Sequence, residues 1–306
     1  NTSTDWAGLV SQQGIQQNHY VDISGGTKDV SYVIGVGYQD EKGVYVNDQY
    51  SRYNLKANIN AKLSNKWSAG FNVNAAYSTQ EQGSDNSILS AYRMSPITDA
   101  YANGKLAATS NHLEGDVIVV PGKTTEILKD AAGNAIFPNS IGSGGFTSSI
   151  NPLVDLTSSH NNTRRIMAIG SAYLQFNPMK DLAIKSTFSP SLNTYRKGIS
   201  KTTLAEGNYD NPLTSAVEND AKASVDNYTY FNWTFDNQVN YKFTVKEDHA
   251  FDLMGLYSLY SENSELYSAI TAGYNWTYDW YNLGTATTTA NKIGRASCRE
   301  RVSSPV

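Results

Sequence analysis

The side chains best suited to catalysis or metal binding are the four histidines His19, His112, His160 and His249. None has the spacing that places two metal ligands on one helix face, as in the HExxH motif. The chain also has no GxSxG nucleophile elbow, no Walker A loop and no GxGxxG that opens a helix. A serine–histidine pair, as in a membrane-embedded lipase, stays open without any local motif for it. We therefore predict no catalytic residue, no bound metal and no cofactor.

Three weaker features have ordinary structural interpretations. The stretch from Gly142 to Gly145 reads as a flexible loop tip rather than a phosphate cradle. Asp210 and Asn211 could ligate calcium, but a solvated loop is the favoured interpretation. Aromatic side chains in predicted loops could stack on sugar rings, line a membrane interface or pack a lid. These alternatives stay open. They are Tyr101, Tyr209, Trp276, Tyr278, Trp280 and Tyr281.

Composition limits the function classes. The chain has 306 residues, 24 basic and 28 acidic side chains, 40% hydrophobic residues and 21 tyrosines. An aromatic-rich chain with a net charge of only −4 can bury enough surface to fold. No cluster of lysine and arginine predicts nucleic-acid binding. No apolar run reaches the roughly 18 residues of a membrane-spanning helix, but the strands of a membrane barrel alternate and average to low hydropathy.

The C-terminal segment differs from the rest of the chain. Residues 293–302, which contain the only cysteine, Cys298, resemble the in-frame translation of a sequencing adapter. We interpret residues 293–306 as an artefact rather than native sequence, the alternative being a genuine basic tail. Without them no cysteine remains for disulfides, thiol catalysis or metal ligation. Because the chain also begins without methionine, we expect it to be an internal fragment.

A period of two dominates the remaining sequence. Between positions 53 and 63 the odd residues are apolar or aromatic, and the even residues are polar. Successive side chains of a strand point to opposite faces, so one face is apolar and the other polar. Residues 67–77 repeat the pattern after a short turn at 64–66. The polar set that we predict to face a wet lumen is Asn54, Lys56, Asn58, Asn60 and Lys62.

The same hairpin recurs along the chain. Residues 17–25 and 30–39, 165–177 and 182–195, and 228–244 and 249–260 each flank a tight turn. We therefore predict eight antiparallel strands, with long loops at residues 80–162 and 198–224. Residues 88–94 inside the first loop have helical periodicity. Short turns on one side and long loops on the other are typical of an outer-membrane β-barrel, with periplasmic turns and extracellular loops.

Several short motifs point to one family. The series Gln17-Asn18-His19, Ser24-Gly25-Gly26 and Gly37-Tyr38, with Thr4-Asp5-Trp6 before it, resembles the SusC/RagA family of TonB-linked outer-membrane transporters. Further motifs that carry the resemblance are Glu41-Lys42-Gly43, Arg52-Tyr53-Asn54-Leu55-Lys56-Ala57-Asn58, Asn151-Pro152-Leu153 and Asn282-Leu283-Gly284.

The resemblance implies an all-β fold and an importer function. Residues 1–292 would form part of a transmembrane antiparallel barrel, about eight strands of the roughly 22 in large outer-membrane transporters. The family implies uptake of oligosaccharides or peptides through the outer membrane of a Gram-negative bacterium. A SusD-like surface lipoprotein would act as the lid, and the TonB complex would supply energy. The plug and the TonB-contacting segment of the family are not in these residues, and eight strands of such a design should not close by themselves.

Two other classes remain open from the sequence. One is a small, self-contained outer-membrane barrel with a structural or adhesive role. The other is a soluble carbohydrate-binding β-sandwich, whose apolar faces would be covered by a second sheet.

Overall fold

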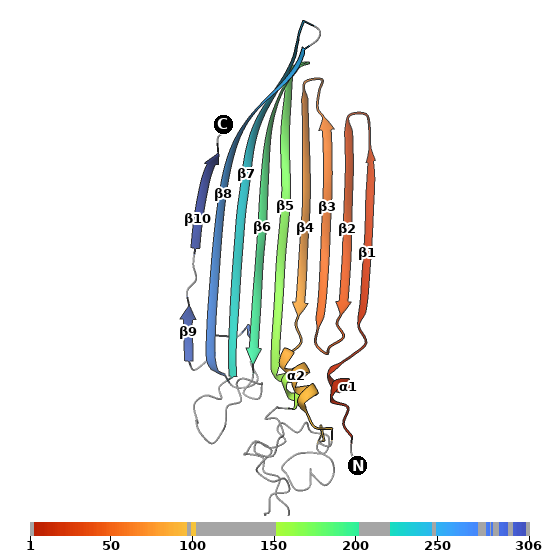
Figure 1. The fold of residues 1–306 in the computed structure, drawn as a ribbon, viewed down its shortest axis with the longest axis vertical. Coiled ribbons are helices and arrows are strands. Elements are labelled where there is room, and N and C mark those ends of the chain that lie inside the picture. Colours follow the sequence, from red (N-terminus) through yellow and green to blue (C-terminus); the bar gives the residue numbers. More distant parts are fainter. Residues whose placement is uncertain are drawn as a thin grey trace, which may run out of the picture.

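The chain forms one antiparallel sheet of long, adjacent strands (Figure 1). The computed structural model describes residues 3–96, 99–101, 151–201, 221–246, 249–274, 280–281, 283, 288–292 and 296–303. The eight long strands are β1 (Ile15–Gly26), β2 (Val30–Lys42), β3 (Gln49–Lys62), β4 (Trp67–Glu81), β5 (Ser159–Met179), β6 (Leu182–Lys201), β7 (Ala221–Val245) and β8 (His249–Tyr274). Each pairs with the next along the chain, so the four predicted hairpins are confirmed.

The strands extend further than the alternation predicted, mainly at the loop end. The ladder between β6 and β7 continues to Lys201 and Lys222, inside the loop predicted at residues 198–224. The ladder between β4 and β5 likewise continues to Glu81 and Asn162. Main-chain hydrogen bonds do not require an apolar face, so strand pairing can continue beyond the residues that alternate between apolar and polar. The connection between β6 and β7 is therefore shorter than predicted.

Two short strands, β9 (Thr288–Lys292) and β10 (Ala296–Ser303), lie along the outer edge of β8. β10 falls inside the segment that the sequence analysis interprets as adapter-derived. An open strand edge offers unpaired N–H and C=O groups to almost any extended chain. This pairing therefore agrees equally with a native tail and with an artefact.

The sheet does not close on itself: its two edges remain apart. In the described part of the chain β1 pairs only with β2, and β8 does not return to it. A self-contained eight-strand barrel would need that closing pair. The described residues also contain no second sheet over the apolar face, which leaves side chains such as Ile23 66% exposed. The topology thus favours a segment of a larger barrel wall over both alternatives.

Three short helices lie together at the loop end, below β1 to β5 in the view of Figure 1. They are α1 (Trp6–Val10), α2 (Asp85–Arg93) and α4 (Pro152–Ser158). The helical periodicity of residues 88–94 is confirmed by α2. Among the described residues, none of the helices has the length and apolarity needed to cross a membrane. We call this group of helices, with residues 95–96 and 99–101, the cap.

The cap has a small core of its own. Trp6, Val10, Ala91, Ala100 and Leu156 form one buried cluster, and Trp6 is only 3% exposed. The indole Nε1 of Trp6 donates a hydrogen bond to the carbonyl of Ser95 at 2.9 Å. A buried indole N–H needs such a partner, so this bond fixes α1 against the segment that follows α2.

Local sequence explains where two cap helices begin. Asp5 is the N-cap of α1, and its carboxylate accepts a hydrogen bond from the backbone of Gly8 at 3.0 Å. Asn151 precedes α4, and its Oδ1 accepts from the backbone of Leu153 at 3.0 Å. Pro152 follows at the first helical position, where its missing N–H costs nothing. Two of the family motifs, Thr4-Asp5-Trp6 and Asn151-Pro152-Leu153, are thus helix starts.

Candidate functional site

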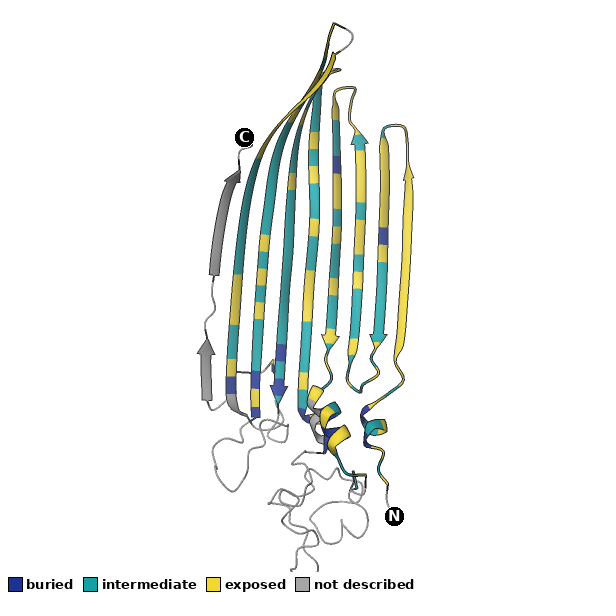
Figure 2. Cartoon of the chain, viewed as in Figure 1, coloured by how far each residue is buried: buried dark blue, intermediate teal, exposed yellow. Residues whose placement is uncertain are grey.

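The two faces of the sheet are chemically distinct. Asn54, Lys56, Asn58, Asn60 and Lys62 lie on one face of β3, and the apolar residues between them lie on the other. The register extends the polar face sideways: Asn58 pairs with Asn72 of β4, which pairs with Ser171 of β5. Little of the sheet is buried except near the loop end (Figure 2).

Side-chain hydrogen bonds connect residues within and between strands on the polar face. Within β3, the Asn60 amide donates to Asn58 at 2.9 Å. The Tyr173 hydroxyl of β5 reaches over β4 to donate to Asn60 Oδ1 at 3.1 Å. It can do so because Gly70 lies between them, where a Cβ atom would collide with the tyrosine ring. The polar face is therefore a connected layer of amides and hydroxyls.

Three carboxylates of β7 and β8 on this face have hydroxyl donors. Glu262 accepts from Tyr260 at 2.7 Å and from Tyr230 at 3.2 Å. Asp226 accepts from Ser268 at 2.5 Å, and Asp236 accepts from Ser258. Hydroxyl donors stabilise ionised carboxylates without neutralising them, so this part of the wall stays acidic but internally bonded.

Unlike these carboxylates, two cationic side chains of β3 have no hydrogen-bonding partner among the described residues. Within the described residues, Arg52 and Lys56 form no ion pair and no side-chain hydrogen bond. Elsewhere on the same face, Arg165 of β5 donates to Asn193 at 2.8 Å, and Lys185 of β6 lies 4.5 Å from the Tyr173 ring centroid. Arg52 and Lys56 thus keep their donors available for a ligand.

Aromatic rows border the apolar face at two levels. Towards the loops, the ring centroids of Tyr38 and Tyr53 are 5.0 Å apart, and those of Tyr53 and Tyr77 are 6.4 Å apart. Towards the turns, the Trp67 and Phe176 rings stack at 4.4 Å. Ten residues of β4 separate the rows, about 33 Å along a strand. Tilted by roughly 40°, that length matches the apolar band of about 25 Å in outer-membrane barrels.

Trp280 packs on the sheet near the loop end of β6 and β7. Trp280 is 7% exposed and lies against Gly198, where any side chain would collide with its ring. The Arg196 guanidinium lies 4.9 Å from the same indole. Trp280 is therefore a packing residue, which resolves the alternatives left open for it. Its neighbour Tyr281 is 75% exposed.

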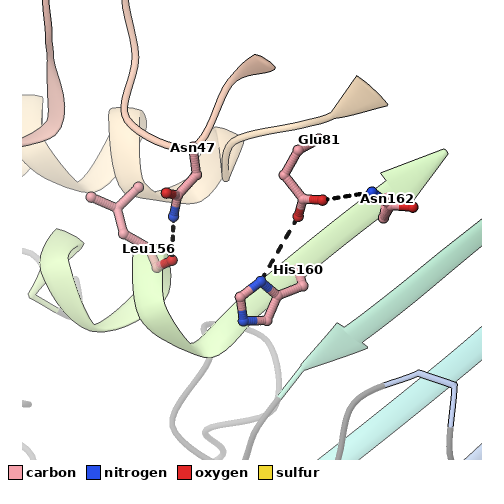
Figure 3. A network of polar contacts seen from close by, with 5 residues as sticks. All are labelled: Asn47, Glu81, Leu156, His160 and Asn162. Carbon is pink, nitrogen blue, oxygen red and sulfur yellow. Dashed lines mark hydrogen bonds and ion pairs between the residues drawn. The ribbon is translucent and has the colours of Figure 1, made fainter. Parts of the chain in front are cut away.

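Polar contacts at the loop end join the cap to the sheet and β4 to β5 (Figure 3). The Asn47 amide, in the connection between β2 and β3, donates to the Leu156 carbonyl of α4 at 2.7 Å. Glu81, at the end of β4, accepts from Asn162 at 2.9 Å and lies 3.8 Å from Nδ1 of His160. The His160 imidazole is the main reason that the pKa of the Glu81 carboxyl is lowered from its usual 4.5.

The structure does not bring together the three histidines that it describes. His19 lies in β1, His160 at the start of β5 and His249 at the turn end of β8. His112, residues 142–145 and Asp210-Asn211 lie outside the described residues. The described residues contain no group of histidine, cysteine or carboxylate side chains that could hold a metal.

The sequence analysis did not single out Asn47 or Glu81. Asn47 has a positive φ of 66°, a conformation that asparagine tolerates, but nothing local indicates its distant partner. The motif Asn151-Pro152 was a usable signal, because an N-cap residue followed by proline predicts a helix start. Asn151 is fully buried, and its amide also donates to the Ala100 carbonyl at 2.9 Å.

Comparison with known proteins identifies relatives of this wall. No protein-family model matches the chain. TonB-dependent receptor P26 of Formosa agariphila is 24% identical over 264 residues, which cover 86% of this chain and 23% of that receptor. TonB-dependent receptor SusC of Bacteroides thetaiotaomicron is 30% identical over 76 residues, 21% of this chain and 8% of that protein. The resemblance to SusC/RagA-type TonB-dependent receptors is confirmed.

The solved structures agree on the fold of this segment. The RagAB peptide transporter superposes with a TM-score of 0.65 at 16% identity, covering 98% of this chain and 30% of that one. The RagAB peptide importer in its closed-closed state gives a TM-score of 0.64 at 15% identity. The fold is thus part of an antiparallel transmembrane β-barrel. The segment spans less than a third of the chains that it matches.

Proposed function

We propose that this segment is part of the wall of a TonB-dependent importer in the outer membrane of a Gram-negative bacterium. The observation that carries the proposal is the pair of opposed faces. One is apolar and bordered by aromatic rows about 33 Å apart along the strand, which at a strand tilt of roughly 40° spans the apolar band of about 25 Å. The other is a connected layer of amides and hydroxyls, as a wet lumen requires. Asn54, Lys56, Asn58, Asn60 and Lys62 then face the lumen.

The cap supports a role for the loop end in substrate capture. Residues from α1, α2 and α4 bury a common core, so this end is a folded surface rather than a simple connection. Tyr92, which is 72% exposed, and Leu89 stand out from that surface. Exposed aromatic and aliphatic side chains of this kind are typical of protein contacts. We propose that the cap lies outside the cell and contacts a SusD-like lipoprotein lid.

The transported material is proposed to be oligosaccharides or peptides. The relatives are named as receptors and a peptide importer rather than enzymes. A wall of amides, hydroxyls and a few charges can exchange hydrogen bonds with either class of solute. We propose no catalytic role, no cofactor and no nucleic-acid partner.

Uptake in living cells tests the proposal. The full-length gene is deleted from its host, and uptake of labelled oligosaccharide and peptide mixtures is compared with that of the parent strain. We expect the deletion to abolish uptake of one mixture, and the full-length gene to restore it only where TonB is functional. Restoration in a TonB-deficient strain would contradict active import. Copurification of a surface lipoprotein with the tagged receptor tests whether a lipoprotein lid binds the receptor.

A further inference from the structure

A hollow of about 330 Å³ opens on the polar face of the sheet. Its polar lining comes from β1, β3 and β4: Tyr20, Arg52, Asn54, Lys56 and Asn74. Its floor is apolar and includes Ala76, Met167 and Ile169. A volume of this size lies within the range of small-molecule sites.

The charges around this hollow are of one sign. Arg52 and Lys56 both line it, and no carboxylate does. Asp22 of β1 lies at the level of Lys56 but two strands away, across Gly35, and forms no ion pair in the described part of the chain. On β7 and β8, Glu262, Asp226 and Asp236 accept hydrogen bonds from hydroxyls. Asp252 forms an ion pair with Lys242 at 3.2 Å. The hollow therefore presents unpaired cationic donors, which favour an anionic ligand.

The hollow lies near the loop end of the strands. Asn54 and Ala76 are sequence neighbours of Tyr53 and Tyr77, which belong to the aromatic row nearest the loops. The hollow thus lies at the loop-end border of the apolar band, just inside the mouth that the cap adjoins. A solute entering from the loop side would meet it early.

We infer that this hollow binds a carboxylate of the transported solute, with an apolar group of the solute against Met167 and Ile169. Arg52 and Lys56 supply charge-assisted hydrogen bonds, which are stronger than neutral ones. Asn54 and Asn74 add amide donors beside them. The inference rests on the proposed import function and specifies its substrate class. A peptide C-terminus and a uronic acid carry the same recognised group.

Binding to the purified full-length receptor tests the inference. Two matched probe pairs separate the sources of the carboxylate: an acetylated leucine-rich tripeptide with a free or an amidated C-terminus, and a disaccharide uronic acid or its methyl ester. We expect the receptor to bind the charged member of one pair roughly 10- to 100-fold more tightly than the neutral member. Equal affinity for both members in both pairs would overturn the inference.

Variants locate the effect. The double variant Arg52→Gln/Lys56→Gln should lose that preference for the charged probe while keeping its affinity for the neutral one. The matched control is Lys28→Gln/Lys62→Gln, which removes two cations from a separate hollow near the turns. The control should keep the preference. Loss of preference in the control alone, or in neither variant, would assign recognition elsewhere.

A labelling measurement keeps the test valid if the double variant assembles poorly. A cysteine at Asn74 in the full-length receptor should react with a water-soluble maleimide, and the charged probe should slow the reaction. A cysteine that is shielded without any probe would mean that another part of the receptor, such as a plug, fills the hollow, and would overturn the inference. Receptor-dependent uptake measured alongside separates this failure from a failure of the import proposal.

Discussion

Asn47 donates a 2.7 Å hydrogen bond to the carbonyl of Leu156, a residue 109 positions later in the chain. This contact joins the connection between β2 and β3 to the last turn of α4 (Figure 3). A carbonyl near the end of a helix has no partner within the helix, so an external donor stabilises it. The bond thus ties the cap to the rigid wall.

Replacing Asn47 separates its backbone role from its side-chain role. Asn47→Gly keeps the positive φ but removes the donor, and should destabilise the cap by about 1 kcal/mol. Asn47→Ala also strains the backbone, adding roughly 1 kcal/mol more. Hydrogen exchange of the α4 amides in the full-length receptor measures both. Equal protection in Asn47→Gly and the parent would show that the bond is not needed.

The core of the cap should depend on Trp6. Trp6→Ala removes a buried ring and its hydrogen bond to Ser95, and should cost the cap roughly 3–5 kcal/mol. Limited proteolysis should then cleave the segment between β4 and β5 faster, while barrel assembly is unchanged. Tyr92→Ala, at an exposed position on α2, is the control and should leave cleavage near the parent rate.

Removing residues 84–158, bridged by a short glycine–serine turn, should spare barrel assembly and abolish uptake or lid association. The strands on either side already pair through Glu81 and Asn162, so a tight turn can join them. The rigid wall positions loops of this kind, and such loops often carry function. Growth on the native substrate with normal lid binding would show that the insertion only packs.

A charge on the apolar face should be poorly tolerated. Ile59 lies near the middle of the band on β3, paired with Phe71 of β4. Ile59→Arg should therefore destabilise the full-length barrel by roughly 2–4 kcal/mol. Asn58→Arg, one residue away on the polar face, should have little effect. Denaturant unfolding in lipid vesicles compares the two. Similar losses for both would mean that Ile59 does not face lipid.

Cysteine labelling tests the assignment of the faces directly. Single cysteines at positions 54, 56, 58, 60 and 62 of the full-length receptor should react with a small water-soluble maleimide. Cysteines at 53, 55, 57, 59, 61 and 63 should not. A one-residue slip exchanges the faces of a strand, so reaction of the odd set would reverse the register.

The loop end of the β4–β5 pair should loosen in acid through Glu81. The neighbouring His160 imidazole lowers the pKa of this carboxyl below its usual 4.5. A carboxyl with a lowered folded-state pKa stabilises the fold above the unfolded-state pKa, and the contribution disappears as the pH falls through the folded-state value. Proteolysis of the insertion with an acid-active protease should therefore accelerate below about pH 4.5 more in the parent than in Glu81→Gln. Parallel pH profiles would contradict this role.

The sequence by itself determined the strands, the hairpins and the two faces. These follow from the period of two, which is a local property: Tyr53 and Asn54 point apart because they are neighbours on an extended chain. The turn at Thr27 was equally local, since its hydroxyl accepts hydrogen bonds from the backbone of Asp29 and Val30. The family motifs indicated which kind of barrel these strands belong to.

Only the tertiary structure decided which distant groups meet. Trp6 and Ser95 are 89 positions apart, and Glu262 reaches Tyr230 only because the β7–β8 register brings their strands together. The unpaired state of Arg52 and Lys56 likewise depends on what the neighbouring strands place beside them. Alternation specifies the face of a side chain but not its partner, because partners are set by strand register and by long loops whose ends the wall holds in place.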